Sequence, residues 1–310
     1  MRIYGAGLAG LLAANVFRKT QYLEVIESQD ELPNNHTALL RHRESHIADA
    51  TSIPFKKVLV RKGINYLGKF YTQATPKLAN MYSHKVTGHY TQRSIWNLDP
   101  VHRYIAPDNF IEKLAHNVPI AFGREIERAD LVFYSSEPYA VPQISTIPMP
   151  AMMRMVDYQN RPEFGSRMIH TFTAKISNCD LYQTVYYPNP DLEVYRISIT
   201  GNNVIAEFLE MPKMPIGEFV SHFLELDFGI TDEMWDFKTA VSRYGKIVPI
   251  DERIRRDFIQ YMTKKFNVYS LGRFATWRNI LLDDVYHDIN VIKTLIDNDG
   301  YYTKAGRSNA

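Results

Sequence analysis

The residues with the clearest chemical pattern are three glycines near the start of the chain, Gly5, Gly7 and Gly10, in the spacing G-x-G-x-x-G. A short apolar stretch before them predicts a strand, and apolar residues recur at helical spacing after them. In such a unit the first glycine permits the tight turn, the second lets a pyrophosphate approach the backbone, and the third lets the helix pack on the strand. Because the free N–H groups at a helix N-terminus favour phosphate, we expect a dinucleotide-binding loop here.

An acidic residue stands where a dinucleotide site needs one. Residues 22–26 predict a second strand, which ends on Glu27. A carboxylate at this strand tip can accept hydrogen bonds from ribose hydroxyls. It also disfavours a 2′-phosphate, so NADP is the least favoured dinucleotide.

A second informative stretch lies near the other end of the chain. Residues 266–271 predict a strand, Gly272 to Arg278 a turn, and 280–292 an apolar-periodic helix. Such a unit places backbone N–H groups at the carboxyl edge of a sheet, where doubly wound proteins bind ligands. By itself it is equally consistent with a terminal strand and helix that only close the sheet.

Gly272 to Arg278, followed by Asp283 and Asp284, resembles the C-terminal flavin-binding segment of UDP-galactopyranose mutases and amine-oxidase-like flavoproteins. Residues 120–122 and 131–135, which read as strands, and residues 137–142 resemble the section of these families that holds the adenine and then crosses to the substrate domain. The resemblance implies FAD as the cofactor, with its pyrophosphate near Gly272. The residues expected to bind it are Gly5, Gly7, Leu8, Ala9, Gly10, Glu27, Arg43, Gly272, Arg273, Phe274, Ala275 and Trp277.

The chain departs from these families just after the ribose-binding acid. The usual glycine-rich stretch with arginines is replaced by residues 34–43, which contain no glycine. Arg41 and Arg43 remain in this stretch and are candidates for contacts to the pyrophosphate.

The middle of the chain predicts antiparallel strands at 182–187, 193–200 and 204–210, joined by tight turns. Such strands cannot continue a parallel sheet, so they indicate a second lobe. Strand alternation places Val194, Arg196 and Ser198 on one face, and Tyr195 and Ile197 on the other. The planar fork of Arg196 suits a carboxylate or phosphate, although sheet arginines commonly pair with a surface acid instead.

The resemblance implies that Arg196, with Tyr186 or Tyr187 beside it, holds an anionic group of the substrate. Lys246 would lie near the flavin ring, as a lysine does in related amine oxidases. The residues expected to take part in catalysis are Arg196, Tyr187 and Lys246. No metal-ligand spacing and no nucleophile or P-loop motif is present, so the cofactor would carry the chemistry.

The strands and helices predicted above indicate an α/β fold. It consists of a doubly wound Rossmann-like FAD-binding lobe and a smaller antiparallel-sheet substrate lobe. The nucleotide lobe is assigned to residues 1–50, 105–150 and 245–310, and the substrate lobe to 51–104 and 151–244. Within the latter, residues 53–60 and 63–66 predict a strand pair with a turn. Lys56, Lys57, Arg61 and Lys62 form a basic cluster there, which is either a solvated face or a patch for an anionic substrate.

The leading functional hypothesis is an FAD-dependent oxidoreductase that oxidises a C–N substrate, such as an amine or amino acid, by hydride transfer to flavin N5. A first alternative follows from a similarity to compact phage-encoded flavoproteins that trim an amino-acid adduct on a thymine base, either as a lyase or as an oxidase. A second alternative is a non-redox nucleotide-sugar mutase. A third is an NAD-binding dehydrogenase or a dinucleotide sensor without turnover.

Composition limits the partners. The 310 residues carry 36 basic and 34 acidic side chains, a formal net charge of +2, so nucleic-acid binding is permitted but not indicated by charge. The sequence contains no run of ~18 apolar residues, so it predicts no membrane helix. The single cysteine, Cys179, excludes an intrachain disulfide framework and fits a cytoplasmic protein, in the host cytoplasm if the gene is a phage gene. Neither the substrate nor the oligomeric state follows from the sequence.

Overall fold

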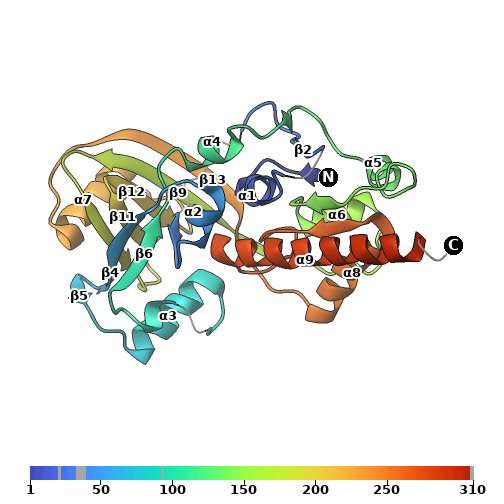
Figure 1. Ribbon diagram of the computed structural model, residues 1–310. Coiled ribbons are helices and arrows are strands. Elements are labelled where there is room, and N and C mark those ends of the chain that lie inside the picture. Colours follow the sequence, from blue (N-terminus) through green and yellow to red (C-terminus); the bar gives the residue numbers. More distant parts are fainter. Residues whose placement is uncertain (20–21, 33–39, 92–93, 308–310) are drawn as a thin grey trace.

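Two β-sheets organise the computed structural model, which describes residues 1–19, 22–32, 40–91 and 94–307. One is a five-stranded sheet and the other has nine strands. Helices cover both sheets, which lie at opposite ends of an elongated molecule (Figure 1). The predicted α/β class is therefore confirmed.

The five-stranded sheet is entirely parallel, with the order β14-β8-β1-β2-β7. From the central strand β1 the chain moves outward to β2 and β7, then returns to β8 on the other side of β1, so the winding reverses between β1 and β8. In doubly wound sheets a ligand binds beyond the carboxyl ends of the strands at such a reversal. The strands are β1 (Arg2–Tyr4), β2 (Glu24–Ile26), β7 (Ile120–Ala121), β8 (Gln143–Ser145) and β14 (Val268–Ser270).

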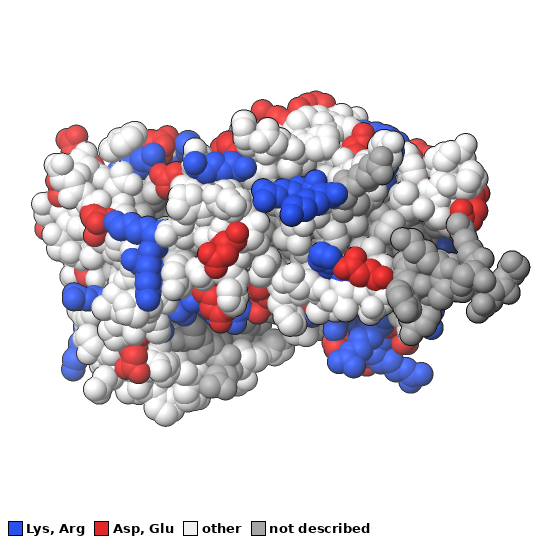
Figure 2. All heavy atoms as spheres, in the orientation of Figure 1, with Lys and Arg blue, Asp and Glu red and all other residues white. Residues whose placement is uncertain are grey.

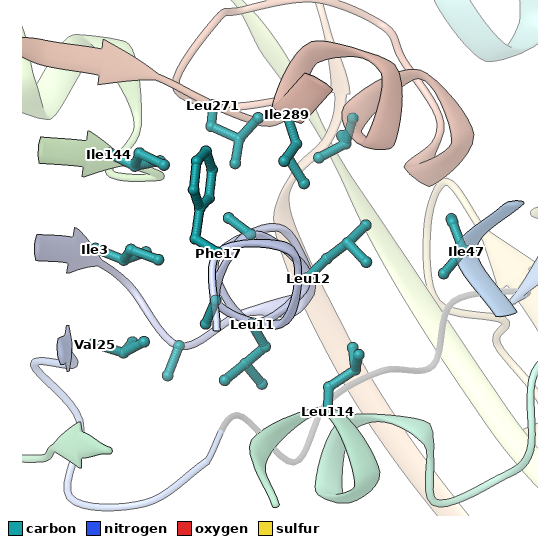
Figure 3. Packing of buried hydrophobic residues seen from close by; sticks show 14 of the residues in the cluster. Ile3, Leu11, Leu12, Phe17, Val25, Ile47, Leu114, Ile144, Leu271 and Ile289 are labelled. Carbon is teal, nitrogen blue, oxygen red and sulfur yellow. The ribbon is translucent and has the colours of Figure 1, made fainter. Parts of the chain in front are cut away.

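Two apolar layers cover this sheet. Helix α1 (Leu8–Val16) packs beside α9 (Leu282–Arg307), α2 (His46–Thr51) and α4 (Phe110–Ala115). Figure 3 shows Phe17, which follows α1, beside Ile144 of β8 and Leu271, while Leu12 of α1 points away from the sheet toward the side of Ile47 in α2. These side chains belong to one buried cluster that also includes Ile289 of α9. The opposite layer contains buried residues of α5 (Arg128–Phe133), α6 (Met149–Met155) and α8 (Glu252–Phe266).

The nine-stranded sheet has the order β13-β9-β12-β11-β10-β4-β6-β3, with β5 beside β4, and only the β4–β10 pair in it is parallel. Helix α7 (Ile216–Phe228) packs on one face and α3 (Pro76–Thr87) on the other. The strands are β3 (Arg41–His42), β4 (Lys56–Tyr66), β5 (Lys69–Tyr71), β6 (Val101–Ile105), β9 (Ser166–Ile176), β10 (Leu181–Tyr186), β11 (Val194–Gly201), β12 (Asn203–Phe208) and β13 (Met234–Ile247), and the single-turn helix η1 (Ser94–Trp96) follows α3.

A buried lysine attaches α3 to this sheet. Lys85 donates hydrogen bonds from Nζ to the carbonyl oxygens of Tyr187 (2.9 Å), Asn189 (2.7 Å) and Val194 (2.7 Å). Three acceptors match the three protons of an ammonium group. Burial lowers the pKa of Lys85 to about 7.

The predicted meander is confirmed as β10, β11 and β12, but three local predictions are wrong. Residues 53–66 do not form a strand pair, because β4 runs unbroken through Gly63, against which the ring of Phe70 packs. Residues 131–135 are not a strand, because a capping box of Glu127 and Asp130 starts α5.

The third error concerns β11, where a bulge between Val194 and Arg196 interrupts the alternation of faces. As a result Val194 lies in the apolar cluster under α7 together with Ile197, and Tyr195 packs in the cluster that contains α3.

Within the described part of the chain, no helix combines the length and the hydropathy that crossing a bilayer requires.

Candidate functional site

The glycine loop after β1 is shaped by contacts that exclude side chains at two of its three glycines. Gly5 has φ +101°, and a Cβ there would lie 2.2 Å from Oγ1 of Thr146, which follows β8. A Cβ on Gly10 would lie 2.0 Å from the carbonyl oxygen of Gly5. The loop is thus folded tightly between β1, β8 and the first turn of α1.

Gly7 differs from its two neighbours. Its backbone is extended (φ −72°, ψ 177°), a conformation open to any residue, and a Cβ there would meet no atom within 4 Å. Gly7 is also the N-cap of α1, and no side chain caps that helix end. The first turn of α1 therefore has no side-chain cap and open space beside its N-cap residue, as a phosphate-binding loop requires.

Glu27 lies at the tip of β2, as predicted, and is only 9% exposed. Its carboxylate accepts hydrogen bonds from the backbone N–H of Ala6 (2.6 Å) and of Gln29 (3.0 Å). Glu27, the residue predicted to contact the ribose, thus links the end of β2 to the glycine loop.

The C-terminal segment meets the glycine loop directly. Gly272, with φ +91°, lies so close to α1 that an added Cβ would be 3.0 Å from Cβ of Ala9. The N–H of Leu271 donates to the carbonyl of Ser145 (2.8 Å), which holds the segment at the end of β8. Two stretches more than 250 residues apart in the sequence therefore form one site at the carboxyl edge of the parallel sheet.

Beyond Gly272 the segment is anchored to β13 and the loop after it. Arg273 donates to the carbonyl of Gly245 (2.9 Å), and its guanidinium lies 5.6 Å from the ring centre of Phe274. Ala275 and Trp277 are each 2% exposed. The indole N–H of Trp277 donates to the carbonyl of Val248 (2.9 Å), so its ring belongs to the core.

The two arginines expected near the pyrophosphate have protein partners in this structure. Arg41 is in β3, where its guanidinium reaches strands β10 and β11 of the nine-stranded sheet. Arg43 forms an ion pair with Asp284, and its backbone N–H donates to Asp283 (3.0 Å) at the start of α9. The hydrogen bond to Asp284 raises the pKa of Arg43. Residues 34–39 of the same stretch lie outside the described residues.

Arg196 has a carboxylate partner that sequence reasoning missed. Its Nε forms an ion pair with Glu207, its cross-strand neighbour on β12, and Glu207 also accepts a hydrogen bond from the hydroxyl of Tyr195 (2.7 Å). Lys246 lies nearby, with Nζ 5.2 Å from the ring centre of Tyr195. Burial opposes the charge of Glu207, but Arg196 and then Lys246 outweigh it, and the pKa of Glu207 is lowered. The structure therefore brings Arg196 and Lys246 together around one carboxylate.

Tyr187 is not part of this cluster. Its ring is fully buried under α7, and its hydroxyl donates to Asp227 (2.7 Å). Tyr186, by contrast, is the cross-strand neighbour of Arg196. Of the two tyrosines considered, the structure places Tyr186 beside the arginine.

The basic cluster of β4 is divided between the two faces of the sheet. Lys62 is paired in register with Thr184, whereas Lys57 and Arg61 point to the opposite face because side chains alternate along a strand. Lys56 forms an ion pair with Asp180 (3.0 Å). Figure 2 likewise shows basic and acidic side chains interspersed over the face in view. These lysines and arginines do not form one continuous patch.

No family model and no curated protein matches the sequence. Solved structures do match the fold. Reduced UDP-galactopyranose mutase superposes with a TM-score of 0.65 at 12% identity, covering 96% of this chain and 93% of the other. An oxidoreductase from Methanosarcina mazei (TM-score 0.58, 10% identity, 94% and 99% covered) and a CLA-producing fatty acid isomerase from P. acnes (0.57, 12%, 94% and 97%) are also similar. The chain therefore has the two-sheet α/β fold of UDP-galactopyranose mutase, one of the flavoprotein families that its sequence resembles.

Proposed function

We propose that this protein is an FAD-dependent oxidoreductase that oxidises a C–N bond of an amine- or amino-acid-like substrate. The observation that supports it best is the contrast within the glycine loop. Gly5 and Gly10 have no room for a side chain, whereas Gly7 faces open space at an uncapped helix N-terminus. That open space is where a pyrophosphate would bind.

The residues around this loop fit FAD. Gly7 and the first turn of α1 would hold the pyrophosphate, Glu27 the adenosine ribose, and Gly272 would cover the pyrophosphate from the other side. The close approach of Gly272 to Ala9 brings these groups to one place. The NAD alternative uses the same loop, but it gives no reason for the resemblance of the segment after Gly272 to flavin-binding segments.

When bound, FAD supplies a hydride acceptor for a C–H bond next to the substrate nitrogen, and the imine that forms is hydrolysed by water. The protein itself must then bind and orient the substrate. Arg196 is suited to an anionic substrate group because only its Nε is engaged by Glu207 among the described residues. Lys246 adds positive charge to the same cluster.

The test is an absorption spectrum of the purified protein before and after denaturation, followed by anaerobic mixing with candidate substrates. Flavin bands and release of FAD on denaturation are expected, and bleaching by an amine or amino acid would support C–N oxidation. Tight binding of a nucleotide-sugar without bleaching would favour the mutase alternative, and bleaching by a modified nucleoside would favour the modified-base alternative. A colourless protein that does not take up added FAD would refute the proposal.

A further inference from the structure

A cationic side chain lies across the face of the nine-stranded sheet on which α3 packs, and no acidic side chain of the described residues pairs with it. From β3 at one edge, Arg41 reaches strands β10 and β11, where Nη1 donates to Oγ1 of Thr184 (2.7 Å). Nε and Nη2 donate to Oγ1 of Thr200 (3.0 and 2.7 Å), and Nη2 also donates to the carbonyls of Ile199 (2.5 Å) and Gln183 (3.4 Å). All of these acceptors are neutral.

No carboxylate among the described residues compensates the charge of Arg41. It makes no ion pair with a carboxylate of the described residues, and the internal segments outside the description contain no Asp or Glu. The neighbouring groups that act on it are the cations Arg196 and Arg103 and the phenols of Tyr186 and Tyr182. Burial first, and then Arg196, lower the pKa of Arg41 to about 10. Arg41 is partly buried, and charges removed from water are normally paired with an anion, which no described residue supplies here.

Hydrogen-bond donors remain available on both arginines. The acceptors of Arg41 among the described residues use one of its two Nη1 protons, and Arg196 uses only Nε. Arg41 lies over Thr184, and Arg196 lies one step along the same face, beside Tyr186, so about 7 Å of strand separates the two positions. Two charge-assisted hydrogen bonds of ~2.8 Å, one on each side of an anion, span a gap of this order.

We propose that Arg41 and Arg196 form a binding site for a carboxylate or phosphate group. The hydroxyls of Thr184 and Ser198 are buried and hydrogen-bond each other at 2.9 Å, and Thr184 also accepts from Arg41, so this pair positions the Arg41 guanidinium rather than contacting the anion. As a statement about the substrate, the inference rests on the proposed function and makes the substrate anionic. The binding of an anion by this face does not depend on flavin.

Thermal unfolding of the wild-type protein at constant ionic strength, with phosphate or acetate replacing chloride, tests the site. We expect saturable stabilisation by at least one of the two anions, and the stronger one identifies the group. Arg41→Lys and Arg196→Lys keep a positive charge but lose the fork, and each should raise the apparent Kd for the anion at least tenfold. Arg256→Lys, in a surface pair with Glu252, is the matched control and should titrate like the wild type.

The absence of saturable stabilisation, or wild-type titrations by both site variants, would overturn the site. Repeating the titration with FAD-saturated protein separates the inference from the cofactor. An unchanged anion Kd supports a substrate site, whereas competition with FAD would assign both arginines to the cofactor and overturn it. If the protein binds no flavin but still binds the anion at these residues, the proposed function fails and the anion site stands.

Discussion

Gly7→Asp should raise the stability of the protein without cofactor while it weakens FAD binding, because Gly7 caps a helix and also faces the space assigned to the pyrophosphate. A Cβ at this position meets nothing within 4 Å, and the backbone is in an extended conformation that aspartate adopts readily. The carboxylate would accept hydrogen bonds from the uncapped N–H groups of α1 and interact favourably with the helix dipole. We expect a gain of about 0.5–1 kcal/mol in the unfolding free energy of the apoprotein.

The same carboxylate would repel the pyrophosphate. A unit charge about 5 Å from one phosphate charge costs about 3 kcal/mol at an effective dielectric constant of 20, which corresponds to roughly a hundredfold increase in Kd. Urea unfolding of the apoprotein and titration with FAD by flavin fluorescence measure the two effects separately.

Gly217→Asp is the matched control, since Gly217 lies in the first turn of α7 and a Cβ there also meets nothing within 4 Å. It adds the same charge to another helix start and should leave the FAD affinity unchanged. The reasoning is refuted if Gly7→Asp binds FAD as tightly as the wild type, or if its affinity falls only because the apoprotein is destabilised.

Three further outcomes follow from buried groups. Because the folded-state pKa of Lys85, about 7, lies below its ordinary 10.5, the unfolded chain binds more protons between these values, so stability should rise with pH there. The unfolding free energy of the wild type relative to Lys85→Met should rise by up to about 1.4 kcal/mol per pH unit between pH 7 and 10, and a constant difference would contradict the pKa. Tyr187→Phe should cost about 1–3 kcal/mol in urea unfolding, because it removes a donor from the partly buried Asp227, and should leave the FAD affinity unchanged; a weaker affinity would show that Tyr187 acts at the site. Gly10→Ala should lower the melting temperature of the apoprotein, since its Cβ would lie 2.0 Å from the carbonyl oxygen of Gly5, and wild-type stability would show that the loop is less tight than described.

The parts of the site that the sequence predicts correctly depend on short-range chemistry. The glycine spacing, the acid at the end of the second strand and the strand before Gly272 each involve a few adjacent residues, and the parallel sheet then brings them to one edge. The meander is equally local, because tight turns join neighbouring strands.

The parts that sequence reasoning misses depend on register or on distant contacts. The partner of Arg196 is Glu207 because of the alignment of β11 with β12, which follows a bulge that strict alternation does not anticipate. Arg41 acts in the second sheet because β3 pairs with β6, more than 60 residues later in the chain. Residues 131–135 are rich in strand-forming side chains, yet the capping box at Glu127 was the available signal for a helix.

The contact between Gly272 and Ala9 also has a consequence for the order of events during synthesis. The glycine loop leaves the ribosome about 260 residues before the strand and turn that complete its surroundings. At ~5–20 residues per second, the loop waits roughly 13–50 s for its partner. Until then β8 lacks its neighbour β14, and the apolar side of α1 lacks α9. A nascent chain therefore cannot complete the proposed cofactor site until Gly272 has emerged, and a product that ends before residue 272 should bind FAD weakly.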